Sequence, residues 1–310
     1  MDRKILVAVD GSIYSTHALY YLGHLYENLP GIHFHLLTMV PLTSSSAALE
    51  MLDEAELINT LGASARKTLL AQDKYMQHAV EQLVRYGVPA AQISSSVRPA
   101  RMGISQDILQ EARKGRYDAL VIGRRGIGKI EELFMGSVSS SILEICHDTP
   151  VWIIDGKVNS RKFLVPIDGT FNSLNAVDHL AYMLASNPGA EVTLFHSAAL
   201  LAGKTTADPK EFHEKWGKEW CDQHLDRPDS LFHAPRQLLV ESGFPENNIF
   251  WLETFKGIDP SRQILRQALI DDFGTIVIGR RGSEVEKGVF KRVSDRILYM
   301  AEEVAVWIVG

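Results

Sequence analysis

A glycine-rich segment in the N-terminal half has the spacing of an anion-binding loop. Gly123 and Gly126 follow a short apolar run, and Gly136 and Ser137 come after nine more residues. Glycines can adopt positive φ angles and let a ligand approach the backbone closely. A helix that begins at Gly136 and Ser137 exposes N–H groups, which favour phosphate together with the helix macrodipole. The full spacing predicts a phosphate site, whereas a single Gly-x2-Gly would predict only a turn.

The same segment matches the beginning of a P-loop, which is a competing interpretation. Gly123, Gly128 and Lys129 have the Gly-x4-Gly-Lys spacing of that motif. The next residue is Ile130, where a P-loop needs serine or threonine for Mg2+, and the preceding strand is the fourth of its predicted domain. We therefore do not expect a P-loop. The cationic side chains that could face phosphate, or simply be solvated, are Arg124, Arg125 and Lys129.

Residues for catalysis or metal binding form no recognisable pattern in the sequence. A hydrolase needs a nucleophile with its base, or a set of metal-binding carboxylates, and neither is evident. His33 and His35 share one face of a predicted strand, but two ligands without a third favour ordinary strand histidines. Cys146 and Cys221 lie in different halves of the chain, so we expect structural thiols and no disulfide.

Three anchors recur along the chain in the same order, which indicates an internal duplication. Residues 4–12 return at 162–170, residues 121–126 at 277–282, and residues 151–153 at 306–308. The period exceeds that of solenoid repeats and predicts two whole domains, 1–156 and 161–310. The length of 310 residues also fits two domains of common size.

Each copy alternates short apolar runs with longer segments of helical period, the pattern of a parallel sheet covered by helices. Strands are predicted at 4–10, 33–40, 91–97, 118–123 and 150–154, and again at 162–168, 190–196, 248–254, 274–279 and 305–309. Helices are predicted at 14–26, 61–86 and 104–112. Pro228 and Pro235 interrupt the second copy of the long helix, which we expect to be split or partly irregular.

Composition and charge narrow the class of partner. The net charge of -6 argues against a general nucleic-acid binder, which needs a surplus of clustered Lys and Arg. No apolar run approaches the roughly 20 residues of a membrane-spanning helix, and the first apolar run is too short for a signal peptide. We expect a cytoplasmic protein with small-molecule or protein partners, and neither nucleic acid nor membrane.

The uninterrupted spacing Gly123-x2-Gly126-x9-Gly136-Ser137 resembles the ATP-binding signature of the universal stress protein family. Residues 7–12 also resemble the first strand and turn of that family. The resemblance covers nearly the whole chain, which looks like a tandem member. It implies an α/β fold of two tandem Rossmann-like (adenine nucleotide alpha hydrolase-like) domains, each an open five-stranded parallel sheet with helices on both faces.

The resemblance implies a binding role for nine residues of the N-terminal half. The base and ribose would lie against Ala8, Asp10, Met39, Ile122 and Gly123. Backbone and hydroxyl donors for the phosphates would come from Gly126, Gly136, Ser137 and Val138. Asp10 has an alternative role as a turn or helix-capping residue before Gly11 and Ser12. The implied cofactor is ATP, with Mg2+ left open.

The C-terminal copy departs from this signature. It begins with Gly279 and Gly282 but has Lys291 or Arg292 where the Gly-Ser pair should stand. Such a side chain could fill the site or bind a different anion. We expect a degenerate nucleotide site there, although Asp168 repeats Asp10.

These features favour an ATP-binding regulatory protein of the stress response that contacts an unknown protein partner in a nucleotide-dependent way. A ligand- or protein-binding scaffold without nucleotide and a weak ATPase are the alternatives. The last strand of each copy would be an open sheet edge. By the family resemblance, we expect the two copies to pair there as an internal pseudo-dimer, and a homodimer stays open.

Overall fold

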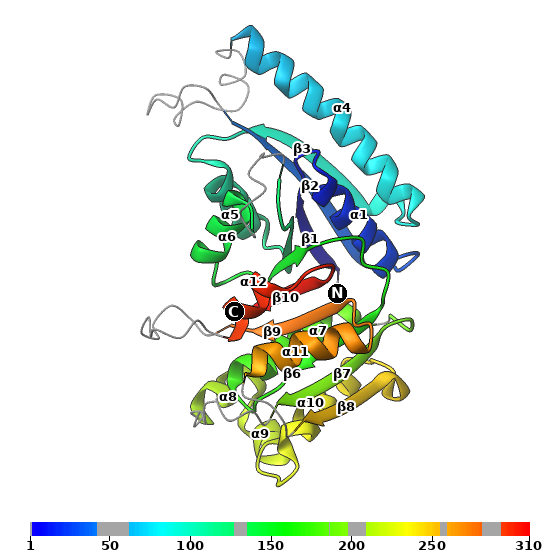
Figure 1. Ribbon diagram of the computed structural model, residues 1–310, viewed down its shortest axis with the longest axis vertical. Coiled ribbons are helices and arrows are strands. Elements are labelled where there is room, and N and C mark those ends of the chain that lie inside the picture. The colour runs from blue at the N-terminus through cyan, green and yellow to red at the C-terminus, as the bar shows by residue number, and fades with distance from the viewer. Residues whose placement is uncertain are drawn as a thin grey trace. The chain divides into compact units, whose positions relative to one another are not determined.

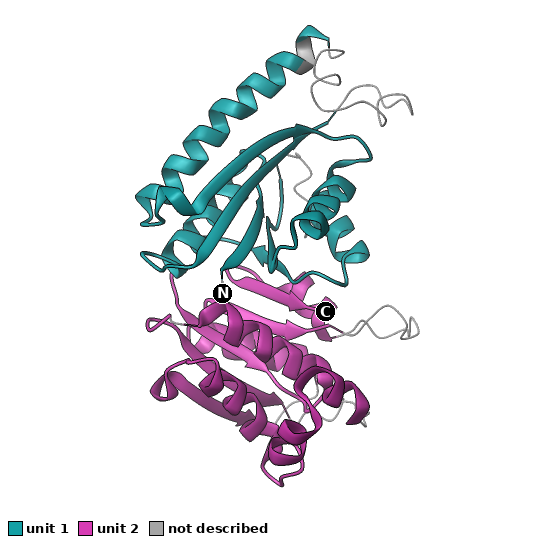
Figure 2. Ribbon diagram, turned by 180° about the vertical axis from the view of Figure 1, so that it is seen from behind, with its two compact units in different colours: residues 1–157 teal, residues 158–310 magenta. Residues whose placement is uncertain are grey.

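The computed structural model describes most of the chain, in the ranges 2–41, 62–126, 135–185, 187–197, 209–254, 259–280 and 293–310. The chain divides into two compact units, Met1–Lys157 and Val158–Gly310, coloured separately in Figure 2. Each unit contains five strands that pair in parallel.

The N-terminal unit is a doubly wound sheet with the strand order β3-β2-β1-β4-β5. Its strands are β1 (Arg3–Ala8), β2 (Ile32–Val40), β3 (Ile93–Pro99), β4 (Ala119–Gly123) and β5 (Val151–Ile154). Its described helices are α1 (Ile13–Leu25), α4 (Ala63–Arg85), α5 (Ile104–Gly115) and α6 (Ser137–Ile145), with a 3-10 turn at Ala90–Gln92. Helices α1 and α4 cover one face of the sheet, and α5 and α6 cover the other (Figure 1). The strand order reverses between β1 and β4, which is where such sheets bind ligands.

The C-terminal unit repeats this topology, with the order β8-β7-β6-β9-β10. Its strands are β6 (Lys162–Pro166), β7 (Glu191–Ser197), β8 (Ile249–Thr254), β9 (Thr275–Gly279) and β10 (Ala305–Val309). Its described helices are α7 (Phe171–Leu184), α8 (Pro209–Trp216), α9 (Lys218–His224), α10 (Ser230–Glu241), α11 (Pro260–Ile270) and α12 (Val293–Met300), with a 3-10 turn at Glu246–Asn248.

All ten strands confirm the sequence prediction to within about two residues at either end. The central strands could be recognised because they are apolar along their whole length. Ala119 to Ile122 are all buried, and so are Phe163 to Val165, since helices cover both faces of each sheet.

The second copy of the long helix is split, as predicted, into α8, α9 and α10. Pro228 lies just before α10 and accounts for the interruption between α9 and α10, whereas Gly217, with positive φ, lies between α8 and α9. The expectation that Pro235 also breaks the helix was wrong, because Pro235 lies inside α10. Its missing N–H removes only the bond that the Leu231 carbonyl would receive in a regular helix.

Cys146 and Cys221 are buried free thiols, and burial is the main cause that raises the pKa of each. Of the helices that the structure describes, none has the length and apolar character required to cross a bilayer.

Candidate functional site

A cavity of about 400 Å³ lies at the carboxyl ends of β1, β2 and β4. It brings together all nine residues that the sequence predicted, Ala8, Asp10, Met39, Ile122, Gly123, Gly126, Gly136, Ser137 and Val138. Further apolar residues on its wall are Leu37, Val40, Ile104, Ile108 and Met135. Parallel register explains part of this convergence, because Ala8 lies opposite both Leu37 and Ile122.

Asp10 holds the turn between β1 and α1. Its Oδ1 atom accepts hydrogen bonds from the backbone N–H of Ser12 at 3.0 Å and from Ser15 Oγ at 2.7 Å. Ser12 is the N-cap of α1 and accepts from the Ser15 N–H at 3.2 Å. Of the two alternative roles for Asp10, the structure has the turn role, because the cap is Ser12, while Asp10 also lines the cavity.

The loop residues Gly123, Gly126 and Gly136 are glycines because neighbouring atoms lie too close for a Cβ atom, and not because the backbone needs unusual φ angles. Gly123 and Gly126 do not have positive φ, so that part of the sequence interpretation was wrong. A Cβ atom on Gly123 would lie 2.7 Å from Tyr14 Cβ, so this glycine lets β4 pack on α1. A Cβ atom on Gly126 would lie 2.5 Å from Asp10 Oδ2, and one on Gly136 would lie 3.2 Å from Arg125 Cα.

The N-terminus of α6 faces this cavity. Gly136 is its N-cap, with extended backbone and no side-chain cap. The next three residues, Ser137, Val138 and Ser139, line the cavity. Their N–H groups belong to the first helical turn, which has no intrahelical acceptors. The Ser139 hydroxyl is used otherwise, because it donates to the Gly123 carbonyl at 2.9 Å.

Two neighbouring arginines have different environments. The Arg124 side chain is 4% exposed and forms an ion pair with Asp155 at 3.1 Å, so it is a structural residue. Arg125 lines the cavity, and its buried Nε has no hydrogen-bond partner among the described residues. The sequence does not distinguish these two arginines, because the difference depends on the direction in which each side chain points after the end of β4. Lys129 lies outside the described residues.

Sequence reasoning missed the contribution of α4 to the cavity. Thr68 and Gln72, one helical turn apart, line it, and the buried Gln72 Oε1 atom has no partner in the described part of the chain. Tyr75 follows on the same helix, and burial raises the pKa of its phenol. The spacing of these polar residues on one helix face was a usable signal, but only once α4 was known to pack against β2 and β3.

The corresponding positions of the C-terminal unit differ. Asp168 keeps its turn role, accepting from Thr170 N at 3.0 Å and Thr170 Oγ1 at 2.6 Å. Strand register places Ser197 where the N-terminal unit has Met39, and Ser197 donates to Gln263. The expectation for Gly282, Lys291 and Arg292 lies outside the described residues.

The two strand histidines are ordinary polar residues in the structure. His35 lies between Ser94 Oγ and Ser96 Oγ, each at 2.8 Å, and burial lowers its pKa. His33 lies 3.7 Å from the carboxylate of Asp2. Searching the described ranges gives no group of three or more His, Cys, Asp or Glu side chains placed to hold a metal ion.

The fold and the cavity define a duplicated, doubly wound α/β protein with a ligand-sized site at the switch point of its first sheet. The model of the universal stress protein family matches residues 1–155 and again 159–309. The chain therefore belongs to the universal stress protein family and contains two copies of its domain.

Known relatives agree with this assignment. The universal stress protein YxiE of Bacillus subtilis (strain 168) is 30% identical over 158 residues, which are 50% of this chain and 99% of that protein. A universal stress protein from Archaeoglobus fulgidus DSM 4304 has a TM-score of 0.62 and 18% identity, covering 99% of this chain and 98% of its own. A functionally unknown protein from Pseudomonas aeruginosa PAO1 has a TM-score of 0.50 and 16% identity, covering 99% and 92%. At these identities the structural likeness shows the fold alone.

Proposed function

We propose that the N-terminal unit binds an adenine nucleotide, ATP by the family resemblance, and that the bound nucleotide changes how the protein contacts a regulatory protein partner under stress. The observation that carries the proposal is the convergence of all nine predicted residues on one cavity. Its volume of about 400 Å³ is typical of small-molecule sites.

The chemistry of the wall supports an adenine nucleotide. Apolar side chains such as Met39, Ile108 and Ile122 offer a surface for a flat base, and Gln72 offers an unpaired acceptor for an amino or hydroxyl group. The first turn of α6 and the Arg125 guanidinium offer donors for phosphate. An unpaired buried donor is costly in a folded protein, so an anionic ligand that pairs with Arg125 Nε would relieve that cost.

Regulation through a partner is the broader part of the proposal. Nucleotide would contact the residues at the end of β4 and at the beginning of α6, because Gly123, Gly126, Gly136 and Ser137 line the cavity. A ligand that prefers one arrangement of these residues shifts the population toward it, and a partner that contacts them would sense the change. Capture of one defined partner with ATP-loaded wild-type protein, and its loss with Gly136→Arg, would test this part.

Calorimetric titration of the full chain with ATP tests the binding part. We expect one site per chain, and at least tenfold weaker binding in Gly126→Ala, because the added Cβ would displace Asp10 Oδ2. The matched control is Gly62→Ala, whose Cβ would meet nothing within 4 Å. Wild-type affinity in both Gly126→Ala and Gly136→Arg would reject the site, and a second binding event lost in Arg292→Ala would reject its restriction to the N-terminal unit.

The described part of the C-terminal unit supports one site per chain. Pro166 replaces Ala8 at the end of the first strand, and the Ser197–Gln263 hydrogen bond occupies the place of Met39. Asp259, the N-cap of α11, also forms an ion pair with Arg296 of α12 at 3.0 Å. These polar contacts replace an apolar surface for a base.

A further inference from the structure

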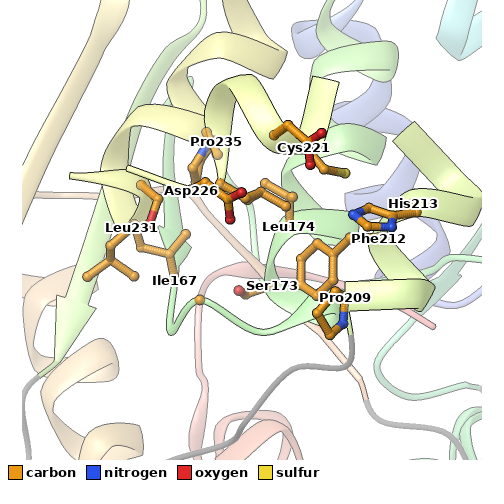
Figure 3. A pocket seen from close by; sticks show the side chains of 15 residues that line it. Ile167, Ser173, Leu174, Pro209, Phe212, His213, Cys221, Asp226, Leu231 and Pro235 are labelled. Carbon is orange, nitrogen blue, oxygen red and sulfur yellow. The ribbon is translucent and has the colours of Figure 1, made fainter. Parts of the chain in front are cut away.

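The C-terminal unit contains a cavity of its own, of about 270 Å³, on which the nucleotide proposal does not draw. It is enclosed by the turn after β6, the beginning of α7, and helices α8, α9 and α10 (Figure 3). Its apolar lining includes Ile167, Leu174, Phe212, Leu231 and Pro235.

The cavity results from two changes relative to the N-terminal unit. Tyr75 and Leu231 occupy equivalent positions, because they lie at the same distance from the ends of α4 and α10. Tyr75 approaches the turn glycine Gly11, and Leu231 approaches the turn glycine Gly169. Leucine is smaller than tyrosine and leaves space beside the turn. Pro228 then ends the continuous helix, so the chain turns away as α8 and α9, which supply the opposite wall.

The apolar wall is firmly packed. Phe212 is 4% exposed, and its ring lies 5.6 Å from Phe171 and 5.7 Å from Trp216, measured between centroids. Aromatic contacts of this kind fix the ring orientation. The cavity is therefore a preformed apolar space and not a gap that the neighbouring side chains could easily fill.

Two carboxylates give the cavity a negative rim. Asp222 of α9 and Asp226, just after the end of that helix, both line it, and Figure 3 shows the Asp226 carboxylate directed toward the ring of apolar side chains. Within the described ranges neither has a hydrogen bond or ion pair, and the described basic side chain that lines the cavity is His213, with no Lys or Arg beside it. Burial is the main cause that raises the pKa of the Cys221 thiol, and the negative charges of Asp222 and Asp226 are the next two causes. Both carboxylates therefore act on the same part of the cavity wall, where Cys221 lies.

Two of the nearby cations form ion pairs with other carboxylates. Lys215 pairs with Asp178 at 2.9 Å, and Arg227 pairs with Asp229 at 2.9 Å. The wall holds one more acceptor, because the Leu231 carbonyl cannot receive the usual helical hydrogen bond from Pro235. Among the described residues, the site therefore combines two carboxylates that have no ion-pair partner with a carbonyl acceptor at the edge of an apolar space.

We propose that this cavity binds a small organic amine, with its ammonium group against Asp222 and Asp226 and its apolar body against Phe212 and Leu231. A protonated amine supplies donors and a positive charge that can pair with both carboxylates, and a short aromatic or branched aliphatic body fits a space of about 270 Å³. Carboxylates at the mouth would reject anionic analogues by repulsion.

Titration of the full chain with 2-phenylethylammonium by calorimetry tests the proposal, with 2-phenylethanol as the neutral analogue and phenylacetate as the anionic one. We expect one amine per chain, about tenfold weaker binding of the alcohol, and no binding of the anion. A tenfold difference corresponds to about 1.4 kcal/mol.

Amino-acid variants test how much the two carboxylates contribute to amine binding, apart from the apolar part of the cavity. Asp222→Asn combined with Asp226→Asn should weaken amine binding about tenfold, while Asp229→Asn, an exposed acid that pairs with Arg227, should leave it unchanged. Amine binding that persists at full strength in the double variant, equals that of the alcohol, or disappears in Gly136→Arg would overturn the proposal. Absence of any amine binding would overturn it as well.

Discussion

Replacement of Arg125 by methionine should stabilise the ligand-free protein against unfolding and lower its affinity for ATP. The buried Nε of Arg125 is an unpaired donor among the described residues, and such a group costs about 1–3 kcal/mol. Methionine keeps much of the side-chain volume without the donor. We therefore expect the free energy of unfolding to rise by up to that amount, which is about 2–12 °C in melting temperature for a unit of this size.

The same change should weaken ATP binding by about tenfold to a hundredfold, since a charge-assisted hydrogen bond contributes about 1.5–3 kcal/mol. Chemical denaturation without nucleotide and calorimetry with ATP measure the two effects separately. Arg124→Met is the matched control, because it breaks a buried ion pair with Asp155 and should destabilise the free protein by about 3–5 kcal/mol. An Arg125→Met protein that is less stable than wild type, or binds ATP equally well, would refute the reasoning.

Three further outcomes are expected. Burial lowers the pKa of His179 from 6.5 to about 3, so only the unfolded chain takes up this proton as the pH falls below 6.5. The free energy of unfolding should therefore drop by about 1.4 kcal/mol per pH unit between pH 6 and 4.5, with a shallower slope in His179→Phe. Asp10→Asn should keep the turn and most of the stability, whereas Asp10→Ala should lose about 1–3 kcal/mol in urea unfolding, since only the amide retains an acceptor. If the two units pair through their last strands, Val151→Lys with Val306→Lys should lower the melting temperature or expand the chain in X-ray scattering, and an unchanged profile would count against that pairing.

The sequence predicted the sheets well because their strands are short, apolar and repeated. Buried runs such as 119–122 could be recognised without knowing their neighbours, and the duplication gave each prediction a second, independent instance. Helix interruption at Pro228 followed from local chemistry. The continuity of α10 through Pro235 did not, because tertiary packing can compensate for one missing hydrogen bond.

The candidate site was predictable where a residue acts through its backbone or lacks a side chain. Glycine spacing located the loop, but the reason for Gly123 lies in the position of Tyr14 on another element, which no local pattern reveals. The same limit applies to Arg124 and Arg125, which are neighbours of one type in opposite environments. Gln72 was missed because its helix could not be placed against the strand ends from the sequence.

The duplication itself separates residues that the fold requires from residues that a ligand requires. Gly123 and Gly279 each lie where a Cβ would collide with the helix after the first strand, so both units need glycine there. Asp10 and Asp168 each hold the turn that starts that helix. The Gly-Ser pair at Gly136 has no counterpart in the C-terminal copy, yet that copy forms the same sheet order with all its strands. Folding therefore does not explain the pair. The remaining explanation for the Gly-Ser pair is the cavity that its backbone lines. Gly136→Arg should therefore remove nucleotide binding and leave the parallel sheet of its unit intact.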